Sequence, residues 1–331
     1  VADMHCDTIA EIYAKRQAGE ECGILKNNLH IDLEKMERGD YAVQNFAVFA
    51  HMENLKGKMP LPEYALRLID TFFTELRRYP DRIGIVRSFR DIEKNMAEGR
   101  MSALLTMEEG AICQGKLEYL RIFYELGVRM FTFTWNFPNE LAYPNRYEYL
   151  GPGQDSFVPE TEKGLTEKGF EFLEEMERLG IIADVSHLGD KGILDVISHA
   201  KRPFVASHSG ARAVCRHCRN LTDEMIRALA DRGGVAGINY FDAFVKDRVD
   251  GKAALSLCRD MVAHMKHMKQ IGGIGCIGLG SDFDGFGSPV EMKDCSGMQL
   301  LADEMSREGF STGEIEAVFS ENVLRVYKEL L

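Results

Sequence analysis

Short apolar runs alternate along this chain with longer segments in which apolar residues recur every three or four positions. The short runs predict strands, and the recurring pattern is the period of an amphipathic helix, as at Leu66, Ile69, Phe73 and Leu76. Eight strands are predicted, at residues 1–5, 43–50, 103–107, 130–134, 181–186, 204–207, 235–239 and 276–280. Helices are predicted between them, at residues 63–78, 117–126, 162–179, 192–199, 223–231 and 253–270, and a closing helix follows the capping-box spacing of Ser311 and Glu314.

The order of these elements, a strand and then a helix repeated along the chain, determines the predicted fold. Such a repeat gives parallel strands joined by right-handed crossovers. With eight strands the sheet closes most naturally into an α/β fold, the (β/α)8 TIM barrel, and we expect residues 1–331 to form a single domain of this kind. An open doubly wound sheet is the alternative. No Gly-x-Gly-x-x-Gly follows the first strand, which argues against a dinucleotide-binding version.

Two segments interrupt the alternation. Residues 143–159 hold three of the nine prolines and are expected to form a long loop, while residues 24–40 are polar and irregular. Because loops after barrel strands shape the pocket, we expect both segments to contribute to its walls.

Composition narrows the class of protein. With 45% hydrophobic and 28% charged residues, the composition is that of an ordinary globular protein. The net charge is −12 and there is no basic stripe to neutralise phosphates, so nucleic acid is excluded as a partner. Eight scattered cysteines in a chain of this length indicate reduced thiols and a cytoplasmic protein. No apolar run approaches the roughly 18 residues needed to span a membrane, so no membrane partner is expected. Val1 in place of a methionine leaves open that a leader was removed.

Polar side chains gather at the predicted strand ends. His5 and Asp7 lie on one face of an extended strand, where an imidazole and a carboxylate can hold a divalent metal. The carboxyl ends of barrel strands converge on one mouth, where active sites of this fold are built. The residues expected there are His5, Asp7, Glu108, His187, His208 and Asp282, with Trp135, Asn136 and Asn239 at the same ends. Three imidazoles and two or three carboxylates suffice for two metal ions bridged by one carboxylate.

Two of these assignments have a neighbouring alternative. Strand alternation leaves Glu108 and Glu109 as competitors, since a shift of one residue exchanges them. Asp282 directly follows its strand and is preferred to Asp284, which is expected to shape the turn at Gly285.

Other groups are weaker candidates for chemistry. Cys215 and Cys218 flank His217, but no second ligand pair accompanies them, as a structural zinc site would require. His264 and His267 are one helical turn apart among lysines and are expected on a solvated helix face.

The motifs at these positions resemble those of the renal, or membrane, dipeptidase family of the amidohydrolase superfamily. The resemblance runs in matching order over essentially the whole chain. It rests on His5-x-Asp7, Met107-Glu108-Glu109-Gly110, Asp184-Val185-Ser186-His187, Ser207-His208-Ser209, Arg219-Asn220 and Gly280-Ser281-Asp282-Phe283-Asp284-Gly285. Trp135 stands where eukaryotic relatives place a histidine that contacts the substrate, so the chain looks like a bacterial-type member.

The resemblance implies a role for each residue. The implied metal ligands are His5 with Asp7 for one zinc, Glu108 as the bridge, and His187 with His208 for the second zinc. It assigns Asp282 as the proton carrier and Arg219 as the group that binds the substrate carboxylate. Trp135, Asn136 and Asn239, at the same strand ends, are expected to be further substrate contacts. The expected cofactor is two Zn²⁺ ions, although nitrogen and oxygen ligands of this kind also accept Mn, Co or Fe.

The expected activity is hydrolysis of the single peptide bond of a dipeptide by a hydroxide held between the two metals. Since family members often accept a D-residue at the carboxyl-terminal position, L-D dipeptides are among the expected substrates. The alternatives are hydrolysis of an N-acyl amino acid or a lactone at the same metals, and a metal-binding protein without catalysis. The last would lack ligands, and none is missing. The expected partner is a small dipeptide, and a homodimer is an open alternative to a monomer.

Overall fold

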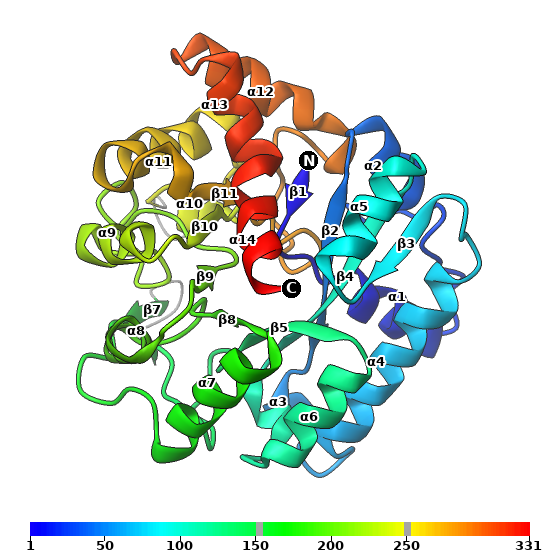
Figure 1. Ribbon diagram of the computed structural model, residues 1–331, viewed down its shortest axis with the longest axis vertical. Helices are drawn as coiled ribbons and strands as arrows, with labels where there is room; N and C mark the ends of the chain where they lie inside the picture. Colours follow the sequence, from blue (N-terminus) through cyan, green and yellow to red (C-terminus); the bar gives the residue numbers. More distant parts are fainter. Residues whose placement is uncertain (150–154, 248–252) are drawn as a thin grey trace.

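The computed structural model describes residues 1–149, 155–247 and 253–331. Within these residues eight parallel strands form a closed ring surrounded by helices (Figure 1), which confirms the predicted (β/α)8 barrel. The ring closes because β11 pairs with β1 and because β2 pairs with β4 along its whole length. In order around the ring the strands are β1 (Ala2–Asp3), β2 (Val43–Phe49), β4 (Met101–Glu108), β5 (Val128–Thr132), β8 (Ile182–Asp184), β9 (Val205–Ala206), β10 (Val235–Ile238) and β11 (Ile277–Leu279).

The helices follow the predicted order. Every predicted helix is present, and three end signals are confirmed: Thr222 and Ser311 cap helices through their hydroxyls, and Gly180 ends a helix with a φ of 81°. The helices of this set are α4 (Leu61–Leu76), α6 (Leu117–Glu125), α7 (Glu167–Leu179), α8 (Asp190–His199), α9 (Asp223–Asp231), α11 (Cys258–Gly272), α13 (Thr312–Glu316) and α14 (Asn322–Leu330).

Several elements were not predicted. β3 (Ile83–Val86) pairs with the first half of β4 and stays outside the ring, and its four residues are too short to show a pattern. The segment 24–40, predicted to be irregular, contains α2 (Leu33–Arg38), capped by Asp32. The other additional helices are α1 (Thr8–Gln17), α3 (Met52–Leu55), α5 (Phe89–Ala97), α10 (Asp242–Val245) and α12 (Met298–Arg307).

The segment 143–159 is not the irregular loop that its prolines predicted. β6 (Arg146–Tyr149) and β7 (Asp155–Val158) pair in antiparallel fashion, and residues 150–154, with Gly151 and Gly153, lie outside the described residues. Asn145 anchors the segment, because its Nδ2 donates to the carbonyl of Cys218 at 2.6 Å.

The last helix closes one end of the barrel. Val323, Val326 and Tyr327 of α14 pack against the first residues of several strands, including Val43 and Val235. The Tyr327 hydroxyl donates to Asn45 Oδ1 at 2.9 Å inside the ring. The helix crosses the middle of the barrel in Figure 1. Because α14 fills the barrel at the amino ends of the strands, we expect the functional site at their carboxyl ends.

The cysteines were expected to be reduced thiols. All eight cysteines are free thiols, and seven of them are buried. No helix in the described ranges combines the length and apolar character needed to cross a membrane.

Candidate metal centre

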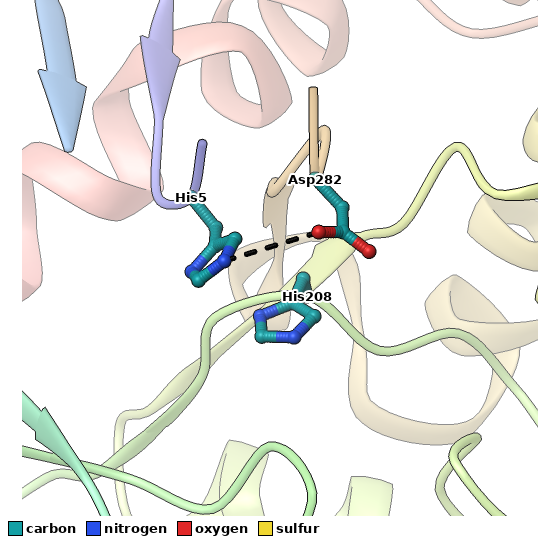
Figure 2. A group of neighbouring side chains, drawn as sticks. All are labelled: His5, His208 and Asp282. Atoms are coloured by element: carbon teal, nitrogen blue, oxygen red, sulfur yellow. Dashed lines mark ion pairs between the residues drawn. The ribbon is translucent and has the colours of Figure 1, made fainter. Parts of the chain in front are cut away.

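Five polar side chains from separate strand ends meet in one group at the carboxyl end of the barrel. The histidines and the glutamate of this group are buried, and the aspartate side chain is 15% exposed. Figure 2 shows three of them pointing toward one another from three different segments. The members are His5 after β1, Glu108 at the end of β4, and His187, His208 and Asp282 after β8, β9 and β11.

Glu108 lies at the centre of the group because its two oxygens face different partners. Oε1 is 2.9 Å from Nε2 of His187 and 3.7 Å from Nε2 of His208. Oε2 is 3.2 Å from Nε2 of His5, which in turn is 3.4 Å from Asp7 Oδ2. Donor atoms of Glu108, His187 and His208, and those of His5, Asp7 and Glu108, each gather within 4.8 Å of one another. A single carboxylate therefore joins two sets of potential ligands.

The donor atoms themselves fit a divalent cation. Nε2 of His5 and Oδ1 of Asp7 are buried without a hydrogen-bond partner in the part of the chain that is described. Nε2 of His187 and Nε2 of His208 are 3.0 Å apart, while Nδ1 of His187 lies 3.0 Å from Asn136 Oδ1. Because an amide oxygen only accepts, the hydrogen of His187 belongs on Nδ1, and its Nε2 lone pair faces the other ring. A cation between nitrogen and carboxylate donors satisfies this arrangement.

Electrostatics keeps two of the histidines neutral, the form in which an imidazole binds metal. Burial and, after it, the positive charge of Arg219 lower the pKa of His187 to about 3. Burial also lowers the pKa of His208 well below its ordinary value, with His5 and Arg219 acting in the same direction.

The His5 side of the group favours positive charge instead. Burial alone would lower the pKa of His5, but the carboxylates of Glu108 and Asp7 raise it well above its ordinary value. Burial raises the pKa of Asp7 to about 7. Burial would also raise the pKa of Glu108, but His5 and His187 hold it far below its ordinary value. The carboxylates thus attract a cation to the space around His5 Nε2.

Two of these side chains point into the site because their backbone adopts a strained conformation. His187 has a φ of 69° and Asp282 a φ of 60°, in the left-handed region that residues other than glycine rarely adopt. Such positions cost on the order of 1 kcal/mol each and cluster at functional sites. Gly285 packs against the same group, since an added Cβ would lie 2.4 Å from Asp282 Oδ1 and 2.5 Å from Asp7 Oδ2.

The two neighbouring acids that competed for these positions have other partners. Glu109 has a φ of 91° and accepts hydrogen bonds from the Ala111 backbone at 2.9 Å and from Asn139 Nδ2 at 2.7 Å. Asp284 accepts from the Thr8 hydroxyl at 2.6 Å and from the His30 backbone at 2.7 Å. Glu108 and Asp282 are the members of each pair that face the histidines.

A cavity of about 770 Å³ opens above the group. This volume lies within the range of small-molecule sites. Two of the predicted substrate contacts, Trp135 and Asn136, line the cavity. No described residue of 143–159 lines it, and residues of 24–40 line a second, adjacent cavity. Sequence reasoning missed the aromatic wall formed by Phe49, Phe241, Phe244 and Phe286. Of these, only Phe241 and Phe244 follow the seventh predicted strand, where their three-residue spacing could have indicated a shared face.

The other two expected substrate contacts, Asn239 and Arg219, are not among the residues that line the cavity. Asn239 donates through Nδ2 to Asp282 Oδ2 at 2.9 Å and accepts from the Phe241 backbone. Arg219 is 4% exposed, packs over the Phe244 ring at 5.3 Å, and has no hydrogen-bond partner within the described ranges for Nε and Nη2.

One weaker candidate was placed wrongly. His264 is buried rather than solvated, because its Nδ1 accepts from the Ala211 backbone at 2.8 Å and its Nε2 lies 2.9 Å from the Val245 carbonyl. His267 is half-buried and pairs with Asp223 at 2.6 Å. Cys215 is in no potential ligand group within the described residues.

Comparison with known proteins places the chain in a family. The family model for membrane dipeptidase, peptidase family M19, matches residues 1–330. An uncharacterized dipeptidase of Schizosaccharomyces pombe is 30% identical over 317 residues, which cover 91% of this chain and 72% of that protein.

Two solved structures resemble the whole chain. One is a metallopeptidase from Rhodobacter sphaeroides liganded with a phosphinate mimic of the dipeptide L-Ala-D-Ala, with 26% identity, 100% and 99% of the two chains covered, and a TM-score of 0.85. The other is dipeptidase AC, a metallopeptidase of family M19, with 27% identity, 100% and 98% covered, and a TM-score of 0.84. The chain therefore belongs to the membrane dipeptidase family, peptidase family M19, and is a metallo-dipeptidase.

Proposed function

We propose that the protein hydrolyses the peptide bond of dipeptides, with L-D dipeptides as preferred substrates. The observation that carries the proposal is a buried arginine, Arg219, whose Nε and Nη2 have no hydrogen-bond partner among the described residues, close to a joined pair of metal-ligand sets. The planar guanidinium suits a carboxylate, and its charge is close enough to lower the pKa values of His187 and His208. A free carboxyl terminus held at Arg219 would therefore lie near the metal ligands.

The proposed metal ligands are His5, Asp7, Glu108, His187 and His208, and the proposed metal complement is two zinc ions. When bound, metal ions at these ligands would supply an activated water and polarise the scissile carbonyl. Glu108 would serve both ions because each of its oxygens already faces one set of donors.

Asp282 is the proposed proton carrier. Burial raises its pKa to about 6, so the carboxylate accepts a proton near neutral pH and its acid form can return it. Asn239 holds Oδ2 at 2.9 Å, which leaves Oδ1 to take a proton from the attacking water and deliver it to the leaving amine. Trp135 and Asn136 are proposed to contact the substrate from the cavity wall.

The L-D preference is supported by the Rhodobacter sphaeroides structure, whose bound ligand mimics L-Ala-D-Ala. A screen of L-L and L-D dipeptides with zinc-loaded protein tests the proposal, and N-acyl amino acids and lactones serve as the competing substrates. Turnover of dipeptides, highest for L-D members, is expected. Hydrolysis of acyl amino acids or lactones without hydrolysis of dipeptides would contradict it.

The role of Asp282 has a separate test. Asp282→Asn is expected to lower kcat by at least 10²-fold, the usual scale for losing a general base, while zinc content stays at the wild-type level. An active variant with full metal would show that another group moves the proton.

A further inference from the structure

A chain of buried hydrogen bonds stands behind His208, on the side away from the metal-ligand group. Ser207 Oγ lies 2.7 Å from His208 Nδ1 and 2.6 Å from Asp184 Oδ2. Asp184, Ser207 and His208 are each 1% exposed or less. Water therefore does not compete for these contacts.

The carboxylate of Asp184 is surrounded by donors. Oδ1 accepts from the backbone amides of Ser186 at 3.0 Å and Ser207 at 2.8 Å. Oδ2 accepts from the hydroxyls of Thr132 at 2.7 Å and Ser207 at 2.6 Å. Four donors fill the acceptor positions of one carboxylate, which has no hydrogen of its own to donate.

This arrangement fixes where the hydrogens lie. A hydroxyl has one hydrogen, and at 2.6 Å from a carboxylate oxygen the Ser207 hydrogen must point at Asp184, since Asp184 cannot supply one. The alternative acceptor, Ser186 Oγ, is 3.4 Å away. The contact between Ser207 Oγ and His208 Nδ1 then requires a hydrogen on Nδ1. Nε2 of His208 is left with its lone pair, which faces His187 Nε2 and Glu108 Oε1.

The position of Ser207 is itself held rigidly. Its carbonyl oxygen fits against two glycines of neighbouring strands, where an added Cβ would lie 2.2 Å away at Gly237 and 1.7 Å away at Gly280. His187, by contrast, is oriented by the neutral amide of Asn136. Of these two imidazoles, His208 is the one whose hydrogen-bonded neighbour leads to a charged group, Asp184.

We propose that Asp184 is a positioning residue for the metal centre: through the Ser207 hydroxyl it fixes the Nδ1–H tautomer of His208 and presents the Nε2 lone pair to a metal ion. Outer hydrogen bonds of this kind set the tautomer and basicity of ligating imidazoles. The inference rests on the proposed metal-binding role of His208.

The direct test reads the tautomer without metal or substrate. Nitrogen chemical shifts of ¹⁵N-histidine-labelled, metal-free protein distinguish Nδ1–H from Nε2–H, and H208Q identifies the signals of His208. The Nδ1–H form is expected in the wild type. An Nε2–H form there overturns the proposal regardless of any other variant.

Asp184→Asn tests the charge behind the relay. An amide of the same shape can donate to Ser207 Oγ, which would turn the Ser207 hydrogen toward His208 and move the ring hydrogen to Nε2. Zinc affinity, measured by competition with a chelating dye, is expected to fall roughly 10–100-fold, the usual effect of losing such an outer contact.

Thr132→Val is the matched control, because Thr132 donates to the same oxygen of Asp184 and, among the described residues, makes no side-chain hydrogen bond to Ser207 or His208. Its zinc affinity is expected to stay within about twofold of the wild type, even if its melting temperature falls as far as that of D184N. Equal losses of zinc affinity in both variants would overturn the relay. If D184N does not fold, S207A provides the same comparison against T132V.

The outcomes also separate this inference from the proposed function. A wild-type protein that binds no zinc would refute the metal-binding role of His208 itself. Zinc bound equally by wild type and D184N would refute only the relay.

Discussion

Replacing Arg219 by methionine is expected to make the metal-loaded, substrate-free protein more stable and at the same time less active. The guanidinium is buried, and neither Nε nor Nη2 has a hydrogen-bond partner in the described part of the chain. Burial lowers the pKa of Arg219 even though Asp282 and Glu108 raise it, so its surroundings disfavour the charge that it carries. Methionine fills a similar volume without a charge.

The size of the effect follows from these contacts. Each buried donor without a partner costs about 1–3 kcal/mol, and packing over Phe244 returns about 0.5–1 kcal/mol. The two donors together cost about 2–6 kcal/mol, so the variant is expected to gain about 1–5 kcal/mol of unfolding free energy, or roughly 1.5–7 °C in Tm for a chain of 331 residues. Losing the partner of a substrate carboxylate costs about 3 kcal/mol at the transition state, which corresponds to about a 10²-fold fall in kcat/KM.

Arg212 lies on the same loop and offers a control, because its replacement by methionine is expected to lower the stability instead of raising it. Its guanidinium pairs with both oxygens of Asp190, at 2.7 and 2.8 Å, so Arg212→Met is expected to destabilise the protein by about 2–3 kcal/mol. Melting temperatures of zinc-loaded R219M and R212M are measured beside kinetics on a dipeptide and on the same dipeptide with its carboxyl terminus amidated. The amide should be hydrolysed by wild type and R219M at similar low rates.

Two results would refute this reasoning about Arg219. A fall in stability on R219M as large as that on R212M would mean that Arg219 has stabilising partners in the folded protein. An equal loss of activity on the free and amidated dipeptide would mean that Arg219 does not read the carboxylate.

Two further substitutions test the site and the barrel. Gly285→Ala places a methyl group against the carboxylates of Asp7 and Asp282. It is expected to reduce zinc content and to lower stability by about 1–3 kcal/mol. Gly287→Ala is the control, because its added Cβ has nothing within 4 Å and the variant should behave as wild type. Equal zinc content in the two variants would contradict the close packing at Gly285. Two arginines hydrogen-bond Glu175 and lower its pKa from 4.5 to about 2, so its carboxylate stabilises the protein above pH 4.5 and this contribution is lost as the pH falls toward 2. Urea unfolding should show Glu175→Gln less stable than wild type by about 1–2 kcal/mol at pH 6 and equal to it near pH 2, and a difference that does not change with pH would contradict the ion-pair origin.

The sequence was sufficient for the ring of strands because each strand is a short apolar run bounded by turn residues. It was insufficient where an element is short or its apolar residues are not periodic. β3 has four residues, and the buried residues of α1, such as Ile9 and Ile12, are concentrated in its first half. His264 was misplaced because its neighbouring lysines suggested a solvated face, although Met261, Met265 and Met268 give the same helix a buried side.

The choice between Glu108 and Glu109 shows what a pattern cannot decide. Both follow the same strand, and alternation alone fixes neither. The structure separates them through a left-handed backbone at Glu109, whose carboxylate turns away to bind Ala111 and Asn139. Nothing in the residue types predicts this turn, because it depends on the loop after the next strand. The burial of Arg219, and the lack of a hydrogen-bond partner for its Nε and Nη2 within the described residues, are likewise properties of the assembled site.

The candidate ligands are oriented from behind by polar groups that take no part in the ligand set. Ser207 holds His208, Asn136 holds His187, and Asn239 holds Asp282, each through one hydrogen bond between 2.7 and 3.0 Å. These groups come from loops that immediately follow barrel strands, so the rigid ring fixes both the ligand and the residue that orients it. A substitution behind a ligand should therefore change metal affinity before it changes the fold. Variants at Asp184 and Gly285, compared with those at Thr132 and Gly287, separate these two effects within the same molecule.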